Sequence, residues 1–402
     1  MQAVIFADRL GHELAPLNET HCPALLPVAN APVLQYTIED LATAGVDDLL
    51  IVVSDQADRI KAYFGNGEMW GVHIRYQFSL GEEDPQQLLS RFQSQLEAPF
   101  LVVRGDVLRA GACRQFLEQL PRGKQAVVNA RIGWQQAGMS LVRHWPVQLT
   151  GLEWPQNNSM RQLANALDIE AEAFSPLETL AQFHAASLAL VDNTAGRISL
   201  PGRTLHQGLR IGRLSEIDPR SHMEGNVLVG SDTYVDRSAT ISGPSIVGDN
   251  CYLSRNVSVQ NSIIMPGTYV GENLEVAGAI VTGSTLIRVD LKTEVAISDP
   301  VLLWDMETEV SAMLRQWPQS IVALLLMILS LPLWPLGLLF SVARKPAHPL
   351  GRTAFISNLF ETGIQGRQRK QVQSMRFASG IPLLDNLPML GLVVRGHLRL
   401  FG

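Results

Sequence analysis

Residues 211–259 read IGRLSE IDPRSH MEGNVL VGSDTY VDRSAT ISGPSI VGDNCY LSRNVS V, and this stretch decides the fold of the second half of the chain. Each group of six begins with an aliphatic residue or methionine, nine times in succession. The register slips by one residue near Asn261 and then resumes at Ile264, Val270 and Val276. Ordinary short strands do not repeat in this way, whereas a hexapeptide period is typical of a parallel β-helix with one inward aliphatic residue per hexad. The pattern predicts a β-helix over residues 205–305.

Upstream of this repeat, the chain alternates between two other patterns. Short apolar runs predict buried parallel strands at Ala3–Ala7, Leu49–Val53, Val72–Phe78 and Phe100–Arg104. Helical spacing of apolar residues predicts helices over Val33–Ala44 and Ala57–Phe64. Strands that alternate with helices indicate a doubly wound α/β domain, which we assign to residues 1–200.

The charge of the 402-residue chain is unevenly distributed. The formal net charge is -6, but residues 341–402 hold nine Lys or Arg and two Asp or Glu, so this segment carries +7 and the remainder −13. An acidic body with a basic tail argues against nucleic acid as a partner and favours a tail near anionic phospholipid headgroups. With 46% hydrophobic residues, the chain can bury the cores of two or three domains.

The cysteines and the N-terminus indicate the compartment. Cys22, Cys113 and Cys251 are scattered and lack CxxC spacing, which argues against disulfides and a zinc site and fits a reducing environment. Residues 1–10 do not have the basic and apolar regions of a signal peptide.

A third region, residues 316–402, begins with an apolar run. Ile321–Val342 carries no charged residue and is long enough for a bilayer core. Pro332 and Pro335 lie inside it, so the helix either spans with a kink or turns and leaves on the side it entered. The basic residues that follow mark that end as cytoplasmic and favour the re-entrant alternative; they are Arg344, Lys345 and Arg352.

The segment 1–130 resembles a known family. Its framework positions are Ala7, Gly11, Leu14, Pro16, Leu17, Pro23, Leu26, Pro27, Val28 and Pro32, followed by Ala44-Gly45, Tyr63-Phe64-Gly65 and Gly105-Asp106. This pattern is similar to the sugar-1-phosphate nucleotidyltransferases, which make nucleotide sugars from a nucleoside triphosphate and a sugar 1-phosphate. The resemblance implies a Rossmann-like head, a left-handed β-helix, and Asp106 as the ligand of a divalent metal, Mg²⁺.

The chain departs from that family where the phosphates would bind. Asp8 and Arg9 replace two glycines, Glu13 stands at the family's Arg position, and Ala24 stands at its Lys position. Residues 80–84 are acidic where the family has its base and sugar loop. Each lost charge-stabilising group costs roughly two to three decades of rate, so we expect weak or absent catalysis. The remnant of the nucleotide loop comprises Ala7, Asp8, Arg9, Gly11, Glu13 and Ala24.

The tail has its own resemblance. Ser330-Leu331-Pro332, Gln373–Arg376 and Leu384–Pro388 look like the monotopic phosphoglycosyl transferases, which move a sugar phosphate from a nucleotide sugar to polyprenyl phosphate. The resemblance implies that Asp385 is a catalytic nucleophile. Asn386 stands where that family has its Glu, so the catalytic pair is incomplete.

Taken together, these patterns lead to one hypothesis and two alternatives. We expect an α/β Rossmann-like nucleotidyltransferase domain, a left-handed parallel β-helix and a membrane-associated α-helical tail. The protein would act in bacterial exopolysaccharide or surface-polysaccharide biosynthesis at the cytoplasmic face of the inner membrane, by binding a nucleotide sugar or an assembly protein, and would form homo-oligomers. The alternatives are an active nucleotidyltransferase that uses a nucleoside triphosphate, with catalytic Asp106, and a phosphoglycosyl transferase, with catalytic Asp385.

Overall fold

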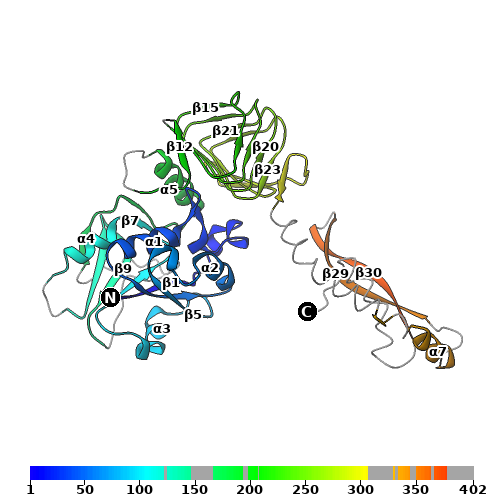
Figure 1. Ribbon diagram of the computed structural model, residues 1–402, viewed down its shortest axis with the longest axis horizontal. Coiled ribbons are helices and arrows are strands. Elements are labelled where there is room, and N and C mark those ends of the chain that lie inside the picture. Colours follow the sequence, from blue (N-terminus) through cyan, green and yellow to red (C-terminus); the bar gives the residue numbers. More distant parts are fainter. Residues whose placement is uncertain are drawn as a thin grey trace. The chain divides into compact units, whose positions relative to one another are not determined.

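The computed structural model describes residues 1–121, 125–145, 166–192, 198–206, 208–306, 329–330, 334–344, 350–363 and 366–377 (Figure 1). The chain divides into two compact units, Met1–Met306 and Glu307–Gly402. The strands and helices predicted over residues 1–104 are confirmed, with bounds that differ by at most one residue.

The head is built on a seven-stranded sheet with the strand order β10-β8-β9-β6-β1-β4-β5. All neighbouring strands are parallel except β9, which runs antiparallel to β6 and β8. The strands are β1 (Gln2–Ala7), β4 (Asp48–Val53), β5 (His73–Phe78), β6 (Phe100–Arg104), β8 (Val127–Ile132), β9 (Gln135–Val142) and β10 (Ala166–Ile169).

Helices cover both faces of this sheet. Successive strand residues point to opposite faces: Ile5 of β1 packs in one apolar cluster with α1, α2 and α4, whereas its neighbour Phe6 packs in another with α3. The head is therefore a doubly wound α/β domain, as predicted. Its helices are α1 (Val33–Thr43), α2 (Ala57–Phe64), α3 (Pro85–Arg91), α4 (Ala112–Glu118) and α5 (Leu180–Asp192).

Short elements complete the head. Two small two-stranded sheets pair β2 (Pro27–Val28) with β3 (Ala31–Pro32), and β7 (Leu108–Ala110) with β11 (Ala173–Ser175). The 3₁₀ turns are η1 (His12–Leu14), η2 (Leu17–Glu19), η3 (Pro23–Leu25), η4 (Glu68–Trp70) and η5 (Gln93–Gln95).

The strand order reverses beside β1. The chain passes from β1 to β4 and β5 on one side, and then returns to β6 on the other side of β1. In an open α/β sheet this topological switch point leaves a crevice at the carboxyl ends of the two strands, where ligands bind. The residues that follow Ala7 and Arg104 therefore line the expected binding crevice.

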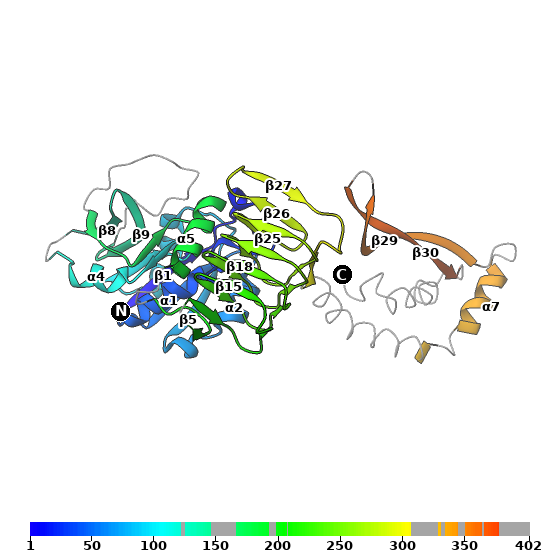
Figure 2. The same ribbon diagram turned by 90° about the horizontal axis from the view of Figure 1, so that it is seen from above.

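Residues 209–282 form a parallel β-helix with three faces (Figure 2). We call them the α5 face, the tyrosine face and the polar face. The α5 face contains β13 (Leu209–Ile211), β16 (Val227–Val229), β19 (Ser245–Val247), β22 (Ile263–Ile264) and β25 (Ala279–Thr282). The tyrosine face contains β14 (Glu216–Ile217), β17 (Tyr234–Val235), β20 (Tyr252–Leu253) and β23 (Thr268–Val270). The polar face contains β15 (His222–Glu224), β18 (Thr240–Ser242), β21 (Ser258–Gln260) and β24 (Glu275–Ala277).

Antiparallel strands border the parallel ones. On the α5 face, β12 (Arg203–His206) pairs with β13, and β26 (Thr285–Arg288) and β27 (Thr293–Ala296) follow β25. On the tyrosine face, β28 (Leu303–Asp305) pairs with β23.

The register agrees with the sequence period. Val229 pairs with Val247, so each turn takes three hexads; after the slip at Asn261 the turn is one residue shorter, and Val247 pairs with Ile264. The predicted inward residues are buried, except Ile217 and Met223, which are partly buried. The predicted parallel strands are thus confirmed; the left-handed sense stays a prediction.

Close stacking of turns explains the glycines that recur in the repeat. A Cβ atom on Gly212 would lie 2.4 Å from the carbonyl carbon of Gly230, and one on Gly248 would lie 2.5 Å from the nitrogen of Pro266. No side chain fits between turns at this distance, so these positions require glycine.

The head and the β-helix share one apolar core. Outward residues of the α5 face, such as Leu228 and Ile246, pack in a single cluster with Phe183 and Val191 of α5 and with Leu17 of the head. In addition, Asn30 Nδ2 donates a hydrogen bond of 2.8 Å to the carbonyl of Val247. The α5 face is therefore covered.

The described part of the tail contains the helix α7 (Trp334–Arg344) and an antiparallel pair, β29 (Leu350–Gly363) and β30 (Gly366–Phe377). The prediction of a helical tail is therefore correct only in part. None of the helices in the described ranges has the length and apolarity needed to cross a membrane. Half of Ile321–Val342, including Pro332, lies outside the described residues, and so does Asp385.

Candidate functional site

The crevice at the switch point contains charged side chains in place of open space. Asp8 and Arg9 follow β1 directly, and Arg104 and Asp106 stand at the end of β6. The exposed fraction of the side chain is 1% for Arg9, and Asp106 is wholly buried. Because such groups are expensive to bury unless they are paired, their partners determine what the site can do.

Arg9 bridges three segments of the chain. Its Nη1 donates to Asp106 Oδ2 over 2.5 Å, its Nε donates to Glu13 Oε1 over 2.8 Å, and its Nη2 donates to the carbonyl of Leu177 over 3.3 Å. Glu13, at the family's Arg position, thus neutralises an arginine that stands at the position of a glycine. These are charge-assisted hydrogen bonds, about twice as strong as neutral ones.

A second arginine holds the same aspartate. Arg104 Nε donates to Asp106 Oδ1 over 3.0 Å and Arg104 Nη2 donates to Asp106 Oδ2 over 2.7 Å. Burial alone would raise the pKa of Asp106, but the guanidinium groups of Arg104 and Arg9 outweigh it and hold that pKa well below its usual range. Both carboxylate oxygens of Asp106 are therefore engaged by arginines.

Asp8 is buried with only part of its hydrogen-bonding capacity used. Ser79 Oγ donates to Asp8 Oδ2 over 2.6 Å, while Asp8 Oδ1 has no hydrogen-bond partner within the described residues. Burial raises the pKa of Asp8 to about 6, and the charges of Asp106 and Glu83 add to this. The buried Asp8 side chain thus fills the space at a position where the resembled family has glycine.

The carboxylates of the acidic loop, residues 80–84, make contacts within the head. The backbone N–H of Leu10 donates to Glu82 Oε1 over 3.1 Å. Glu83 pairs with Arg91 at 2.5 Å, and Asp84 caps α3 by accepting from the backbone of Gln86. A phosphate would bind to backbone N–H groups of the loop that follows β1. One of these groups, the N–H of Leu10, is already bound to the carboxylate of Glu82.

The remaining loop positions are conformational or apolar. Gly11 has a φ of 68°, and a Cβ atom there would lie 2.4 Å from Pro23 Cγ, so glycine is required. Ala7 and Ala24 belong to the buried core, with Ala24 at 1% exposed in η3. No cation stands at the Ala24 position to neutralise a phosphate.

The residues do not fit a divalent metal as they are arranged. Across the part of the chain that the structure describes, no group of three or more His, Cys, Asp or Glu residues could hold a metal ion. Mg²⁺ requires oxygen ligands, and both oxygens of Asp106 face guanidinium groups. The predicted metal and catalytic roles of Asp106 stay predictions, and these ion pairs argue against them.

Sequence reasoning missed Arg104, Ser79 and Leu177 as parts of the site. Arg104 offered a signal, because it closes a wholly apolar buried strand just before Gly105-Asp106. Ser79 and Leu177 reach the crevice only through the fold, since Leu177 lies 168 residues from Arg9.

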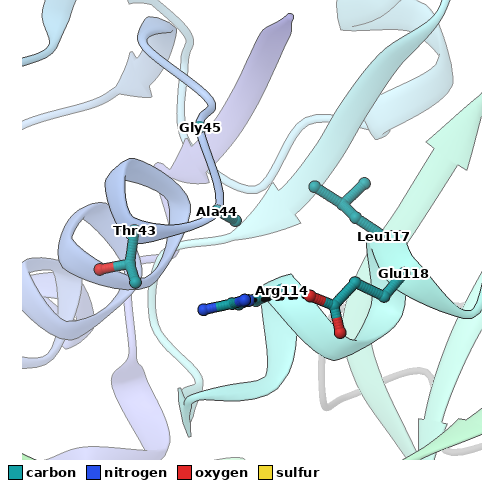
Figure 3. A pocket seen from close by; sticks show the side chains of 6 residues that line it. All are labelled: Thr43, Ala44, Gly45, Arg114, Leu117 and Glu118. Carbon is teal, nitrogen blue, oxygen red and sulfur yellow. Dashed lines mark hydrogen bonds and ion pairs between the residues drawn. The ribbon is translucent and has the colours of Figure 1, made fainter.

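A separate surface hollow of about 530 Å³ lies between the end of α1 and α4 (Figure 3). Because α1 leads from the carboxyl end of β1 to the amino end of β4, this hollow lies at the opposite edge of the sheet from the crevice. Its charged groups, Arg114 and Glu118, pair with each other at 2.8 Å. Its one hydroxyl, that of Thr43, donates to the carbonyl of Glu39 over 2.8 Å, so we do not take this hollow as a candidate active site.

Comparison with known proteins defines the class of the head. Residues 2–137 match the family model described as "Nucleotidyl transferase". The fold and this match show that residues 2–137 are similar to nucleotidyl transferases, and they support a transferase as the class of any activity of the head.

Several of the relatives found are nucleotidyltransferases by name. Glucose-1-phosphate thymidylyltransferase of Streptomyces griseus is 42% identical over 76 residues, 19% of this chain and 21% of that protein. UTP–glucose-1-phosphate uridylyltransferase of a Synechocystis strain is 28% identical over 120 residues, 27% of this chain and 31% of that protein. The low-salt glycan biosynthesis nucleotidyltransferase Agl11 of Haloferax volcanii is 35% identical over 77 residues, 19% of this chain and 22% of that protein. The chain thus spans about a fifth to a third of the length of these relatives.

Proposed function

We propose that this protein is a membrane-associated, nucleotidyltransferase-like component of surface-polysaccharide or exopolysaccharide biosynthesis whose head does not turn over efficiently. Of the two binding roles expected from the sequence, a nucleotide sugar or a protein of the assembly machinery, the closed crevice favours the protein, bound at the cytoplasmic face of the plasma membrane. The sugar-1-phosphate and glycan-biosynthesis relatives support the pathway.

The single observation that carries the proposal is the filled crevice. Asp106 and Glu13 occupy the guanidinium of Arg9, and Glu82 occupies the backbone amide of Leu10. A triphosphate would have to displace these carboxylates from the donors at the switch point. Donors aimed at developing charge usually contribute more to the rate of such a reaction than any other single effect, and here those donors are engaged.

Displacing Arg9 is costly. Breaking one partner out of a buried ion pair costs about 3–5 kcal/mol, which would lower the affinity of an entering nucleotide by roughly two to four decades. The cost arises because Asp106, wholly buried, would lose one of its two neutralising arginines.

Nucleotide binding tests this proposal. We expect the wild type to show no saturable binding of magnesium nucleoside triphosphates at millimolar concentration. Asp8→Gly with Arg9→Gly and Glu13→Arg removes the plug and supplies a cation, and should create measurable binding. Because Ala24 is packed in the core, Ala24→Lys is left out of this set. Saturable submillimolar binding by the wild type would support the alternative, an active nucleotidyltransferase.

The tail supports the membrane part of the proposal. Four apolar side chains of α7 are exposed while Ser341 is wholly buried, the reverse of a water-facing helix; the exposed residues are Leu338, Leu339, Phe340 and Val342. The +7 charge of residues 341–402 suits anionic lipid. The full chain should require detergent, and a chain ending at Met306 should not; a full chain that stays in the supernatant after ultracentrifugation would contradict this.

A further inference from the structure

The three faces of the β-helix differ in what covers them. The α5 face packs against α5 and the head. The polar face presents short polar or charged side chains, among them His222, Thr240, Gln260 and Glu275, and needs no partner. The tyrosine face is not covered within the described residues, and apart from the exposed Glu216, which pairs with Tyr234, its outward residues are aromatic.

An aromatic row runs along the tyrosine face. Tyr234 pairs with Tyr252, Tyr252 with Tyr269, and Tyr269 with Trp304 in adjacent strands. The ring centroids of Tyr234 and Tyr252 are 4.7 Å apart and those of Tyr252 and Tyr269 are 5.6 Å apart, both stacked. The exposed fraction is 39% for Tyr252 and 36% for Trp304.

The polar ends of this row are free. None of the three tyrosine hydroxyls hydrogen-bonds to the described residues, in contrast to Tyr36, whose hydroxyl donates to the carbonyl of Val28. Tyrosine and tryptophan combine an apolar ring with a polar tip, which favours them at the depth of lipid headgroups.

Arginines lie in the turns that follow the strands of this face. The turn that follows each of the first three strands of the tyrosine face carries one, namely Arg220, Arg237 and Arg255. Arg220 and Arg237 are exposed and form no ion pair with the described residues, whereas Arg255 pairs with Glu272 at 2.6 Å. The nearby Asp218 and Asp236 accept hydrogen bonds from their own turns. This edge thus carries carboxylates as well as arginines, and the guanidinium groups are the charges there that suit phosphate.

We propose that the tyrosine face lies on the surface of an anionic phospholipid bilayer, with the aromatic row at headgroup depth and the arginine column on lipid phosphates. The inference rests on the proposed membrane association. It gives the protein a second contact with the membrane, in addition to that of the tail. Continuity along the chain supports it: β28 is the last strand before the tail, Val301 and Leu302 beside it are also exposed, and the apolar run that begins at Ile321 follows soon after Met306 in the sequence.

A fluorescent label tests this contact. The native cysteines are all buried, so a polarity-sensitive thiol label reports on an introduced cysteine. Tyr252→Cys and Arg237→Cys place it at the tyrosine face, the second without removing a ring, and Gln260→Cys places it on the polar face of the same turn. The full chain is bound to vesicles of phosphatidylcholine and phosphatidylglycerol in equal amounts, with a spin label on the headgroup.

We expect a blue shift and spin-label quenching at positions 252 and 237, and neither at 260. Vesicle binding without these changes would overturn the inference and leave the proposed membrane association standing. Failure of the full chain to sediment with vesicles would overturn both. A shift that needs no vesicles and grows with protein concentration would identify a second copy as the occupant and overturn the lipid assignment.

Charge removal gives a second readout. Arg220→Gln with Arg237→Gln should weaken binding to anionic vesicles about fivefold per arginine and leave binding to pure phosphatidylcholine unchanged. Lys292→Gln, in the exposed turn before β27, is the matched control and should have no such selectivity. Equal affinity of the double variant and the control for anionic vesicles would contradict the arginine column's role.

Discussion

Arg9 changes the character of the switch-point crevice by itself. It stands at a position where the family that the head resembles has glycine, and its guanidinium joins Asp106, Glu13 and Leu177. A loop that would receive phosphate has become a loop that closes on its own carboxylates. The same contacts that exclude a ligand stabilise the head, because Arg9, Glu13, Arg104 and Asp106 are all paired.

Arg9→Met should therefore destabilise the protein by about 3–5 kcal/mol, since it leaves the buried Asp106 one cation short. The matched control is Arg131→Met, whose pair with Asp168 is largely exposed and is worth at most about 1 kcal/mol. Urea unfolding followed by tryptophan fluorescence measures both. Equal losses for the two variants would show that the Arg9 cluster is not structurally important.

Asp8 predicts a pH dependence. Its pKa in the folded protein is raised to about 6 by burial, above the unfolded value near 3.9, so the folded state binds more protons between these values. The contribution of Asp8 to stability should therefore fall as pH rises from about 4 to about 6 and then level off. Burial lowers the pKa of His21 to about 4, so His21 contributes a slope of the opposite sign, and the effect of Asp8 is measured as a difference between variants. Asp40, whose pKa burial also raises to about 6, adds to the same slope.

Asp8→Asn should flatten this slope, and Asp58→Asn on the exposed side of α2 should not. Thermal midpoints measured from pH 4 to pH 8 test this. A slope that is unchanged in Asp8→Asn would mean that the carboxyl group is not held in its protonated form by burial.

At the residue scale, the sequence reveals the substitutions but not their partners. Asp8, Arg9 and Glu13 are visible as departures from a family pattern. From the sequence, the only effect that can be predicted for each residue is its effect on a bound phosphate. That Arg9 and Glu13 neutralise each other follows from a four-residue spacing across a turn, and that Arg9 also reaches Asp106 requires a contact across 97 residues.

At the scale of elements, the α5 face joins the head to the β-helix.

Strands with continuous apolar runs and a strict six-residue period are predictable, because burial on one face imposes a period on the sequence. The hairpin β29–β30 is not predictable in this way, since its strands mix apolar residues with arginines and glutamines without alternation. The short strands β7 and β11 carry too few residues for a pattern.

Ile246 tests this junction. It is wholly buried in the cluster shared by the β-helix and α5, so Ile246→Ala should cost about 2–5 kcal/mol and leave a cavity at the junction. Val295→Ala, on the exposed strand β27, is the control and should change little. Differential scanning calorimetry should show the single transition of the wild type broaden or split in Ile246→Ala; an unaltered transition would mean that the two parts do not stabilise each other.

At the scale of the whole molecule, a head similar to nucleotidyl transferases is joined through a shared core to a β-helix. The helix α7 in the tail that follows carries exposed apolar side chains. This combination fits the proposed role, in which the head is held at a membrane and binds a partner there. It fits less well an enzyme that releases a product. The predicted homo-oligomer and the choice of sugar belong to this scale, and neither follows from the contacts of a single chain.

Pyrophosphate release by the purified full chain, assayed over pairs of nucleoside triphosphates and sugar 1-phosphates with magnesium, tests the central claim most directly. The account predicts no release above that of the Arg9→Gly, Asp106→Asn variant, because the wild-type crevice is closed by Arg9, Glu13 and Asp106. Turnover by the wild type at the roughly 1–1000 per second typical of enzymes would contradict it, since a crevice that works at that rate cannot be held shut by these ion pairs.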